Sequence, residues 1–348
     1  MTFVPFRNPL STTLIELQIA EPFYYSQSWL NLITKLYGYT LLPLTVTNSA
    51  GQISGFLPLC YIQSCISGPH LVSLPFSHHC LLLAEDDDSA NELIDHAVRL
   101  AQQYRVQYLE LRTGENDVLK ERADFVESNL YTSWATPLDP GPAALWSRLP
   151  KSVRNKVKKS RRLGVQICLA QRREDMWDYY RLHLRTRTKK HGMPAQPPRF
   201  FLELWDTFAA AGHLQLLLAD WEGVTIAGSI LITSGTTARF LYGASDERYL
   251  HLAPNNLLTW EAINWCYRKG FHSLAHGRTA RANQGLMQFN RNWAAIEKPL
   301  PYYYYPSMAG LPSTSEKSLK YLLLTACWRR LPLQVAEPLG GYLYKHLG

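Results

Sequence analysis

The sequence lacks the short motifs that mark several common enzyme classes. It contains no G-x-x-x-x-G-K-[ST], no G-x-G-x-x-G after a strand, no G-x-S-x-G and no H-E-x-x-H. Each motif supplies chemistry that its class needs, such as a phosphate-binding loop or a pair of zinc ligands. Their absence argues against a P-loop NTPase, a Rossmann oxidoreductase, an α/β-hydrolase and a zinc protease.

Cysteine is scarce, and its positions form no cluster. None of the cysteines belongs to a C-x-x-C motif, and no histidine pair stands beside them at zinc-binding spacing. In a large chain, isolated cysteines of this kind usually act as small buried hydrophobic residues. We therefore expect no metal site and no bound cofactor. The cysteines are Cys60, Cys65, Cys80, Cys168, Cys266 and Cys327.

Long apolar runs are also missing. No run approaches the roughly 20 residues that a membrane-spanning helix needs, and the first residues lack the basic start and apolar core of a signal peptide. We expect a cytoplasmic location.

The length of 348 residues, 46% of them hydrophobic, suits two ordinary domains. The Pro- and Gly-rich break at 137–142 predicts an N-terminal domain over 1–140, a C-terminal domain over 141–308 and a tail over 309–348.

A block of positive charge follows this break. Residues 151–162, K-S-V-R-N-K-V-K-K-S-R-R, contain basic side chains and no acidic one, in a chain of net charge +8. Such a block attracts a phosphate-bearing partner, which can be RNA, a nucleotide-linked substrate or an anionic membrane surface. The alternative is a solvated helix face with no ligand.

Residues 254–285 contain a second candidate anion site. Pro254 followed by two asparagines predicts a helix start, and Gly270 predicts its end. The free N–H groups at the start of a helix bind anions. A polar loop, H-G-R-T-A-R-A-N-Q-G (276–285), follows the next strand and offers arginines for phosphate or carboxylate contacts. The alternatives are a capped core helix and a surface turn.

Two predicted hairpins resemble each other across half the chain. N-S-A-G-Q-I-S-G (48–55) and W-E-G-V-T-I-A-G (221–228) each place one glycine in a turn and a second one early in the following strand. This similarity predicts a duplicated α/β unit, although chance can also produce two matching glycines.

A set of segments carries a wider pattern. They are S-L-P-F-S (73–77), W-S-R-L-P-K-S-V-R-N-K-V-K-K-S-R-R-L-G-V (146–165), V-T-I-A-G-S-I (224–230), L-Y-G-A-S-D-E-R-Y (241–249), P-N-N-L-L-T-W-E-A-I (254–263), G-R-T (277–279), G-L-M-Q-F-N-R-N-W (285–293) and P-L-P-Y-Y-Y-Y (299–305). Together they resemble the FemAB-like branch of the GNAT acyltransferase superfamily. Within that branch, the similarity is greatest to FemAB-related proteins associated with PEP-CTERM and exopolysaccharide loci.

The resemblance implies a fold and an activity. The fold is α/β (α+β), with two tandem GNAT-like domains, each a mixed, mostly antiparallel sheet flanked by helices. FemAB-like enzymes move an aminoacyl group from charged tRNA to an amine, and other GNAT relatives use acyl-CoA. We therefore expect an acyltransferase whose co-substrate is acyl-CoA or aminoacyl-tRNA. Its acceptor would be an amine of a cell-envelope or polysaccharide precursor, bound between the two domains.

The same resemblance, read together with side-chain chemistry, assigns candidate residues. Glu261 and His276 are the candidates for proton transfer. The acceptor side would include Trp260, Asn290 and Trp293. The donor and its phosphates would meet Arg154, Tyr242, Asn255, Asn256, Arg278 and Thr279.

The chain departs from the family pattern at two places. The family usually has an acidic residue and an aromatic one before Gly-Arg-Ser/Thr, where this chain has Ala275 and His276. It also usually has Phe-Lys before a final Trp-Gly, where this chain has Asn290 in place of Lys and Ala294 in place of Gly. Loss of the lysine removes a cation that would stabilise a developing oxyanion.

The tail offers a further partner. Residues 319–333 are apolar with basic residues at one end, Arg329 and Arg330. This pattern is typical of an interfacial element, and predicts peripheral contact with the inner face of the membrane. The alternative is a helix packed back on the domain. We expect no DNA partner. The competing function is a non-catalytic GNAT-fold scaffold that binds RNA or an anionic membrane surface.

Overall fold

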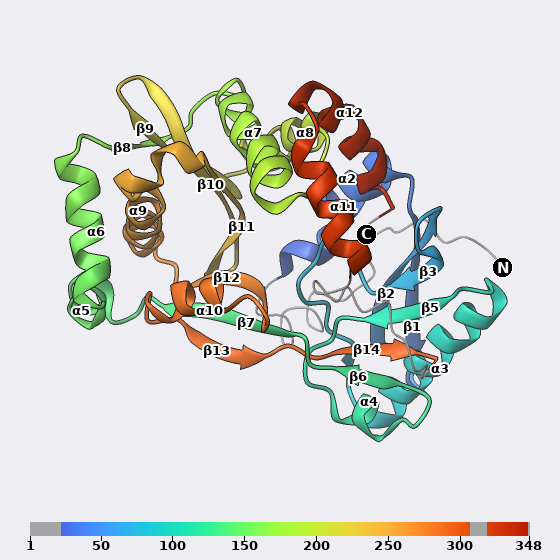
Figure 1. The fold of residues 1–348 in the computed structure, drawn as a ribbon. Helices are drawn as coiled ribbons and strands as arrows, with labels where there is room; N and C mark the ends of the chain where they lie inside the picture. Colours follow the sequence, from blue (N-terminus) through green and yellow to red (C-terminus); the bar gives the residue numbers. More distant parts are fainter. Residues whose placement is uncertain (1–21, 307–318, 347–348) are drawn as a thin grey trace. The chain divides into compact units, whose positions relative to one another are not determined.

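The computed structural model describes residues 22–306 and 319–346, which form two compact units (Figure 1). The first unit contains the chain up to Leu130 and a return segment from Pro299, and the second contains Tyr131–Lys298 with the C-terminal helices. Each unit is a mixed, mostly antiparallel sheet flanked by helices, which confirms the predicted fold class. The domain boundaries predicted at 140 and 308 stay a prediction.

The first unit contains a seven-stranded sheet in the order β1-β2-β3-β5-β14-β6, with β4 paired to β2. β3 and β5 run parallel, and the other pairs run antiparallel. The strands are β1 (Thr40–Thr47), β2 (Ile53–Ser64), β3 (Gly68–Val72), β4 (Leu83–Ala84), β5 (Tyr108–Leu111), β6 (Val126–Ser128) and β14 (Tyr302–Tyr305). The helices are α2 (Gln27–Tyr37), α3 (Asp87–Gln103) and α4 (Asp117–Glu121), with a 3-10 turn at Pro22–Tyr25.

Helix α3 covers this sheet because its apolar residues repeat at helical spacing. Leu93, Ile94 and Ala97 are fully buried in a core shared with β2 and β5. Asp86 caps the helix by accepting a hydrogen bond from the N–H of Ser89 at 2.7 Å. The amphipathic pattern and the acidic cap therefore define this helix locally, and the sheet supplies the surface that it buries.

The second unit contains a seven-stranded sheet in the order β13-β7-β12-β11-β10-β9-β8. β11 and β12 run parallel, whereas β12 with β7, β11 with β10, β10 with β9 and β9 with β8 run antiparallel. The strands are β7 (Tyr131–Pro137), β8 (Gln166–Leu169), β9 (Leu214–Trp221), β10 (Val224–Ser234), β11 (Thr237–Ser245), β12 (Ser273–Ala280) and β13 (Ile296–Pro299).

Helices cover both faces of the second sheet (Figure 1). α6 and α9 lie on one side of β9–β11, and α7 and α8 lie on the other. The helices are α5 (Gly141–Arg148), α6 (Lys151–Arg162), α7 (Asp175–Arg185), α8 (Pro198–Phe208), α9 (Pro254–Arg268), α10 (Gln284–Arg291), α11 (Leu319–Arg330) and α12 (Leu333–Tyr344). A π-helical segment, Thr186–His191, continues α7, and a 3-10 segment, Glu247–Leu252, precedes α9.

The two similar hairpins occupy comparable positions in their units. Gly51 and Gly223 lie in the turns with φ of 75° and 78°, which favour glycine. Gly55 in β2 and Gly228 in β10 lie beneath helices. A Cβ atom at Gly55 would come within 2.8 Å of Leu93 in α3, and one at Gly228 within 2.9 Å of Tyr179 in α7. Both strand glycines therefore let a helix approach its sheet closely, which supports a duplicated unit.

The described part of the tail forms α11 and α12, which pack against the second unit. The Lys189 ammonium donates to the carbonyl oxygens of Arg329 and Leu331, at 3.1 and 2.7 Å, and so caps the end of α11. The predicted alternative of helices packed back on the domain describes this arrangement. None of the helices within residues 22–306 and 319–346 has the length and apolar character needed to cross a membrane.

Candidate active site

In the second sheet, β11 and β12 separate well before β11 ends. β11 and β12 pair over three residues only, and the last pair is Arg239 with Ala275. β11 nevertheless continues to Ser245, still paired with β10 at Ala227. A register shift in β10 at Ile230–Leu231 lies close to the point where β11 and β12 part. The second half of β11 is therefore an edge inside the sheet, open on the side of β12.

The direction of the backbone groups on this edge follows from one hydrogen bond. The N–H of Asp246 donates to the carbonyl of Ile226 at 2.9 Å, so Asp246 faces β10. Backbone groups alternate along an antiparallel strand. The N–H and C=O of Ser245 and Gly243 therefore point away from β10, toward the open side. Gly243 is exposed, and a Cβ atom there would find only Ser229 Oγ within 4 Å, at 3.8 Å.

One hydroxyl group occupies the far end of this open edge. Thr186 Oγ1, in the π-helical segment, donates to the carbonyl of Ser245 at 3.1 Å and accepts from its N–H at 3.2 Å. The Thr186 hydroxyl therefore satisfies the backbone of Ser245, where β12 no longer reaches. Gly243 lies between that contact and the last β11–β12 pair. A ligand with an amide chain would find a short stretch of free strand edge there.

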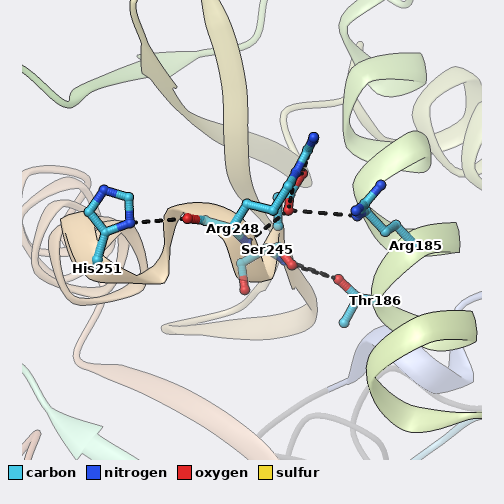
Figure 2. A network of polar contacts seen from close by, with 6 residues as sticks. Arg185, Thr186, Ser245, Arg248 and His251 are labelled. Carbon is cyan, nitrogen blue, oxygen red and sulfur yellow. Dashed lines mark hydrogen bonds and ion pairs between the residues drawn. The ribbon is translucent and has the colours of Figure 1, made fainter.

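A charged network holds the loop that follows β11 (Figure 2). The Asp246 carboxylate is almost fully buried, and it accepts hydrogen bonds from Arg248 at 2.6 to 3.1 Å. Arg185, at the end of α7, lies 3.6 Å from the same carboxylate. Hydrogen bonds from Arg248 lower the pKa of Asp246, so this side chain stays ionised. The network leaves two guanidinium groups partly exposed beside the end of β11.

Helix α9 begins at Pro254, which lacks the N–H that a first helical residue would leave unpaired. Ala253 occupies the cap position with φ of 56°, and no side chain caps the helix. The cap therefore lies two and three positions before Asn255 and Asn256, the two asparagines on which the prediction of a helix start rests. Asn255 instead donates from its amide nitrogen to Ser245 Oγ at 3.2 Å, and Asn256 is half-buried beside it. The helix start thus lies next to the open edge of β11.

His276 lies at the other end of the opening, directly after Ala275, the last residue of β12 that pairs with β11. Thr136 donates its single hydroxyl hydrogen to the carbonyl of Trp293 at 3.0 Å. Its contact with His276 Nε2 at 2.8 Å therefore needs the imidazole to donate. The neutral ring then carries its proton on Nε2 and its lone pair on Nδ1. Burial lowers the pKa of His276 from 6.5 to about 4, so the ring is neutral near pH 7.

Two predicted acceptor-side residues belong to the same buried network. Asn290 of α10 donates from its amide nitrogen to Thr279 Oγ1 at 3.0 Å, and both side chains are buried. Trp293 is fully buried, with its ring 6.2 Å from that of Phe289. Asn290 stands where the family pattern has a lysine, so its neutral amide replaces a cation with a satisfied hydrogen bond.

The side chains of Tyr242 and Arg278 point to one face of the second sheet, and those of Ser245 and Thr279 point to the opposite face. Tyr242 contacts the rings of Phe200 and Phe201, which belong to α8, at 5.8 and 5.6 Å. Arg278 lies 4.4 Å over the ring of Tyr131. Side chains alternate along a strand. Tyr242 and Arg278 therefore lie opposite Ser245 and Thr279, which contact α9 and α10.

The basic block forms α6, and its cations are mostly free of ion pairs. Val153 and Val157 are buried against α9, so the charged residues line the outer face. Arg161 pairs with Glu261 at 2.5 Å. Within the part of the chain that the structure describes, no ion pair is recorded for the remaining basic residues of α6: Lys151, Arg154, Lys156, Lys158, Lys159 and Arg162.

A pocket of about 380 Å³ lies between α5, α6 and α9. The rings of Trp146 and Trp260 meet in its wall at 4.6 Å, and Arg161 lies at its rim. Glu261 is held by its ion pair with Arg161. The predicted residues Trp260 and Glu261 therefore lie on the α6 side of α9, whereas His276 is bound to Thr136 of β7. The structure does not bring the two candidates for proton transfer into contact.

Sequence reasoning missed the residues of α7 and of the π-helical segment. Arg185 and Thr186 lie some 60 residues before the loop that they contact, as the separation of 59 between Thr186 and Ser245 shows. No local pattern in the sequence links them. Arg248 and Asp246 carried a signal, because both belong to the segment 241–249 that the family resemblance uses. Among residues 22–306 and 319–346, no His, Cys, Asp and Glu side chains gather in a way that would hold a metal ion.

Comparison with known proteins agrees with this geometry. The family of acetyltransferase (GNAT) domains matches residues 147–284. No curated protein sequence matches the chain. Among solved structures, the crystal structure of FemX covers 80% of this chain and 91% of its own, with a TM-score of 0.62 at 15% identity.

Two further structures share the arrangement. L-PGS from Bacillus licheniformis covers 89% of this chain and 98% of its own, with a TM-score of 0.54 at 13% identity. A tandem GNAT protein from the clavulanic acid biosynthesis pathway covers 78% of this chain and 85% of its own, with a TM-score of 0.53 at 13% identity. Residues 147–284 thus match the GNAT acetyltransferase domain family, and the chain shares the fold of FemX and of a tandem GNAT protein, which confirms the predicted resemblance to the FemAB-like branch of the GNAT superfamily.

Proposed function

We propose that this chain transfers an acyl or aminoacyl group from a phosphate-bearing donor to an amine. One observation carries the proposal: the open edge of β11 at Gly243 lies beside the uncapped start of α9. An extended amide-containing donor arm can pair with a strand edge, while its phosphates bind free N–H groups at a helix start. A core helix alone would not require an unpaired strand edge at the same place.

The donor is acyl-CoA or aminoacyl-tRNA. Both carry phosphates for the helix start, but only acyl-CoA has an amide-containing arm for the edge of β11. Arg185 and Arg248 supply cations beside the end of β11. The exposed basic face of α6 extends the positive surface on the α9 side of the sheet. An extended cationic surface suits a polynucleotide more than a single pyrophosphate. FemX and L-PGS share the fold, as does a tandem GNAT protein, so the fold leaves both donors open.

The reaction that we propose needs no covalent enzyme intermediate. The acceptor nitrogen attacks the carbonyl carbon of the donor thioester or ester, and an N–C bond forms. The C–S or C–O bond then breaks, and the leaving thiolate or alkoxide takes up a proton. The proton lost by the amine passes to Nδ1 of His276, which carries the lone pair, and from there to the leaving thiolate or alkoxide. Most of the rate enhancement would come from positioning, because a base of low pKa accepts protons weakly.

The acceptor that we propose is an amine of a cell-envelope or polysaccharide precursor. This part rests on the family resemblance and on the fold shared with FemX. We place the reaction in the cytoplasm, where both donors are made, at the inner face of the membrane.

A non-catalytic scaffold is the second candidate. It is favoured by Asn290, whose amide is committed to Thr279 at the position where the family pattern has a lysine. A scaffold would keep the basic face of α6 and lose donor binding at β11. The two functions therefore differ at Gly243, which only the transferase needs.

The first test is donor binding by the purified protein. We expect acetyl-CoA, a longer acyl-CoA or an aminoacyl-tRNA to raise the melting temperature, since a ligand at 100 times its Kd adds about 2.7 kcal/mol. Gly243→Val should lower donor affinity by roughly tenfold or more, because its side chain would stand in the open space beside the edge. Calorimetric titration would measure both affinities.

The matched control is Gly285→Val at the start of α10, where a new Cβ atom also has no neighbour closer than 3.8 Å. It should leave donor affinity unchanged. Equal affinities of Gly243→Val and the wild-type protein would remove the β11 edge as the donor site. The absence of a shift with every donor would favour the scaffold.

A further inference from the structure

The helical pair α11–α12 presents an apolar stripe on its outer side. In α12, the exposed residues Val335, Pro338, Leu339 and Tyr342 repeat at the spacing of a single helix face. Val335 is 47% exposed, Leu339 40% and Tyr342 57%. Leu323 and Leu324 of α11 are 59% and 61% exposed. These two short helices thus expose five large apolar side chains, three of them on one face of α12, and exposed apolar surface of this kind marks a site of interaction.

The inner side of α12 is packed against the rest of the second unit through small residues. Ala336 is fully buried. Gly340 lies so close to the segment before α8 that a Cβ atom would come within 3.1 Å of the Ala195 nitrogen. Because the small residues of α12 make the packed contact, its large apolar residues lie on the opposite face. The outer stripe therefore belongs to a helix whose inner face is held in place.

The described charged side chains of α11, α12 and Lys345 are mostly positive. Among the side chains that the structure describes from residue 323 onward, the basic ones are Arg329, Arg330 and Lys345, and the one acidic side chain is Glu337. The Lys345 ammonium lies 4.5 Å over the ring of Tyr342 and so stands directly beside the stripe. Apolar side chains flanked by Tyr and by basic residues match the layered chemistry of a membrane interface.

We propose that the outer stripe of α12, with Leu323 and Leu324 of α11, docks on an anionic phospholipid bilayer. The apolar side chains enter the boundary between headgroups and acyl chains, while Arg329, Arg330 and Lys345 meet the lipid phosphates. A 12-residue helix is too short to span, so α12 lies in the plane of the surface. A second copy in a symmetric dimer would instead bring these like charges together, which disfavours that occupant.

Vesicle co-sedimentation tests the proposal with the full-length protein. We expect binding to phosphatidylcholine vesicles that contain phosphatidylglycerol, and weak binding to pure phosphatidylcholine. The double variant Val335→Glu/Leu339→Glu should lower the partition coefficient by roughly tenfold or more, because two apolar anchors become anions. Arg329→Gln/Arg330→Gln should lower it by roughly tenfold on anionic vesicles only.

The chain offers a closely matched control. Val224 and Leu250 lie elsewhere in the second unit and are 46% and 39% exposed, against 47% and 40% for Val335 and Leu339. Val224→Glu/Leu250→Glu adds the same charges and should keep vesicle binding. An equal loss in both double variants would overturn the proposal, because bulk charge would then explain it.

Two other results would also overturn it. One is wild-type protein that stays in the supernatant with anionic vesicles at low ionic strength. The other is a dimer, seen by light scattering, that Val335→Glu/Leu339→Glu converts to monomer, since a second copy would then cover the stripe. This docking does not depend on the proposed transferase activity, because every readout is binding.

Discussion

His183 shows how a single buried histidine couples this fold to pH. Its Nε2 contacts Gln196 Oε1 at 2.8 Å, and its ring lies 4.7 Å from that of Phe201. Burial, together with the nearby charge of Arg187, lowers the pKa of His183 from 6.5 to about 3. As the pH falls, His183 is therefore protonated near pH 6.5 in the unfolded chain but only near pH 3 in the folded chain. Stability is fully present above pH 6.5 and falls as the pH decreases toward 3.

We predict that removing this histidine flattens the pH dependence of unfolding. Between pH 7 and pH 5, the wild-type protein should lose roughly 2 kcal/mol of its free energy of unfolding through His183. The His183→Asn variant should not show this loss. Urea unfolding at the two pH values measures the difference. His276, whose pKa is also lowered, keeps part of the slope in the variant. Equal slopes in both proteins would show that His183 titrates normally when folded.

Ala294 illustrates what a residue can and cannot reveal before the structure is known. The family pattern has a glycine there, and Ala294 indeed has φ of 53°, in the region that favours glycine. That backbone demand was readable from the resemblance. The contact of Asn290 with Thr279 was not, because it depends on how α10 packs on β12.

At the scale of elements, local signals predicted several parts of the second unit. The helix expected between Pro254 and Gly270 is α9, and the hairpin expected at 221–228 joins β9 to β10. Proline, glycine and hydrophobic periodicity act within a few residues, so a sequence displays them. The opening between β11 and β12 is different. It arises where strand pairing stops, and Thr186 closes it from 59 residues away.

The seat of α12 gives a prediction at this scale. Gly340→Val would place a Cβ atom 3.1 Å from the Ala195 nitrogen and 3.2 Å from its carbonyl oxygen, so α12 must move outward. Overpacking of this kind costs about 1–3 kcal/mol. We expect faster amide hydrogen exchange in α12, with β9–β11 unchanged. Gly285→Val, in open space, is the control. Unchanged exchange in α12 would mean that another contact holds the helix.

At the scale of the whole molecule, the chain passes from the first unit to the second and then returns to the first. β14 follows the entire second sheet in sequence, yet it lies in the first sheet between β5 and β6. Tyr302 and Tyr303 are fully buried there, and the Tyr302 hydroxyl donates to the carbonyl of His78 at 2.6 Å. Burying two tyrosines contributes roughly 3–6 kcal/mol as an upper value, a large share of the net stability of a domain. The first unit therefore depends on residues that follow the entire second sheet in the sequence.

We predict that a chain ending at Leu300 loses the first unit and keeps the second sheet. Without β14, β5 and β6 have no strand between them, and the burial that balances chain entropy is lost. A chain ending at Pro306 is the control, because it retains β14 and also lacks α11 and α12. Hydrogen exchange should show β5 and β6 protected only in the longer chain, with β9–β11 protected in both. Equal protection of β5 and β6 in both chains would show that the first sheet closes without β14, and that its late strand adds stability to an already folded unit.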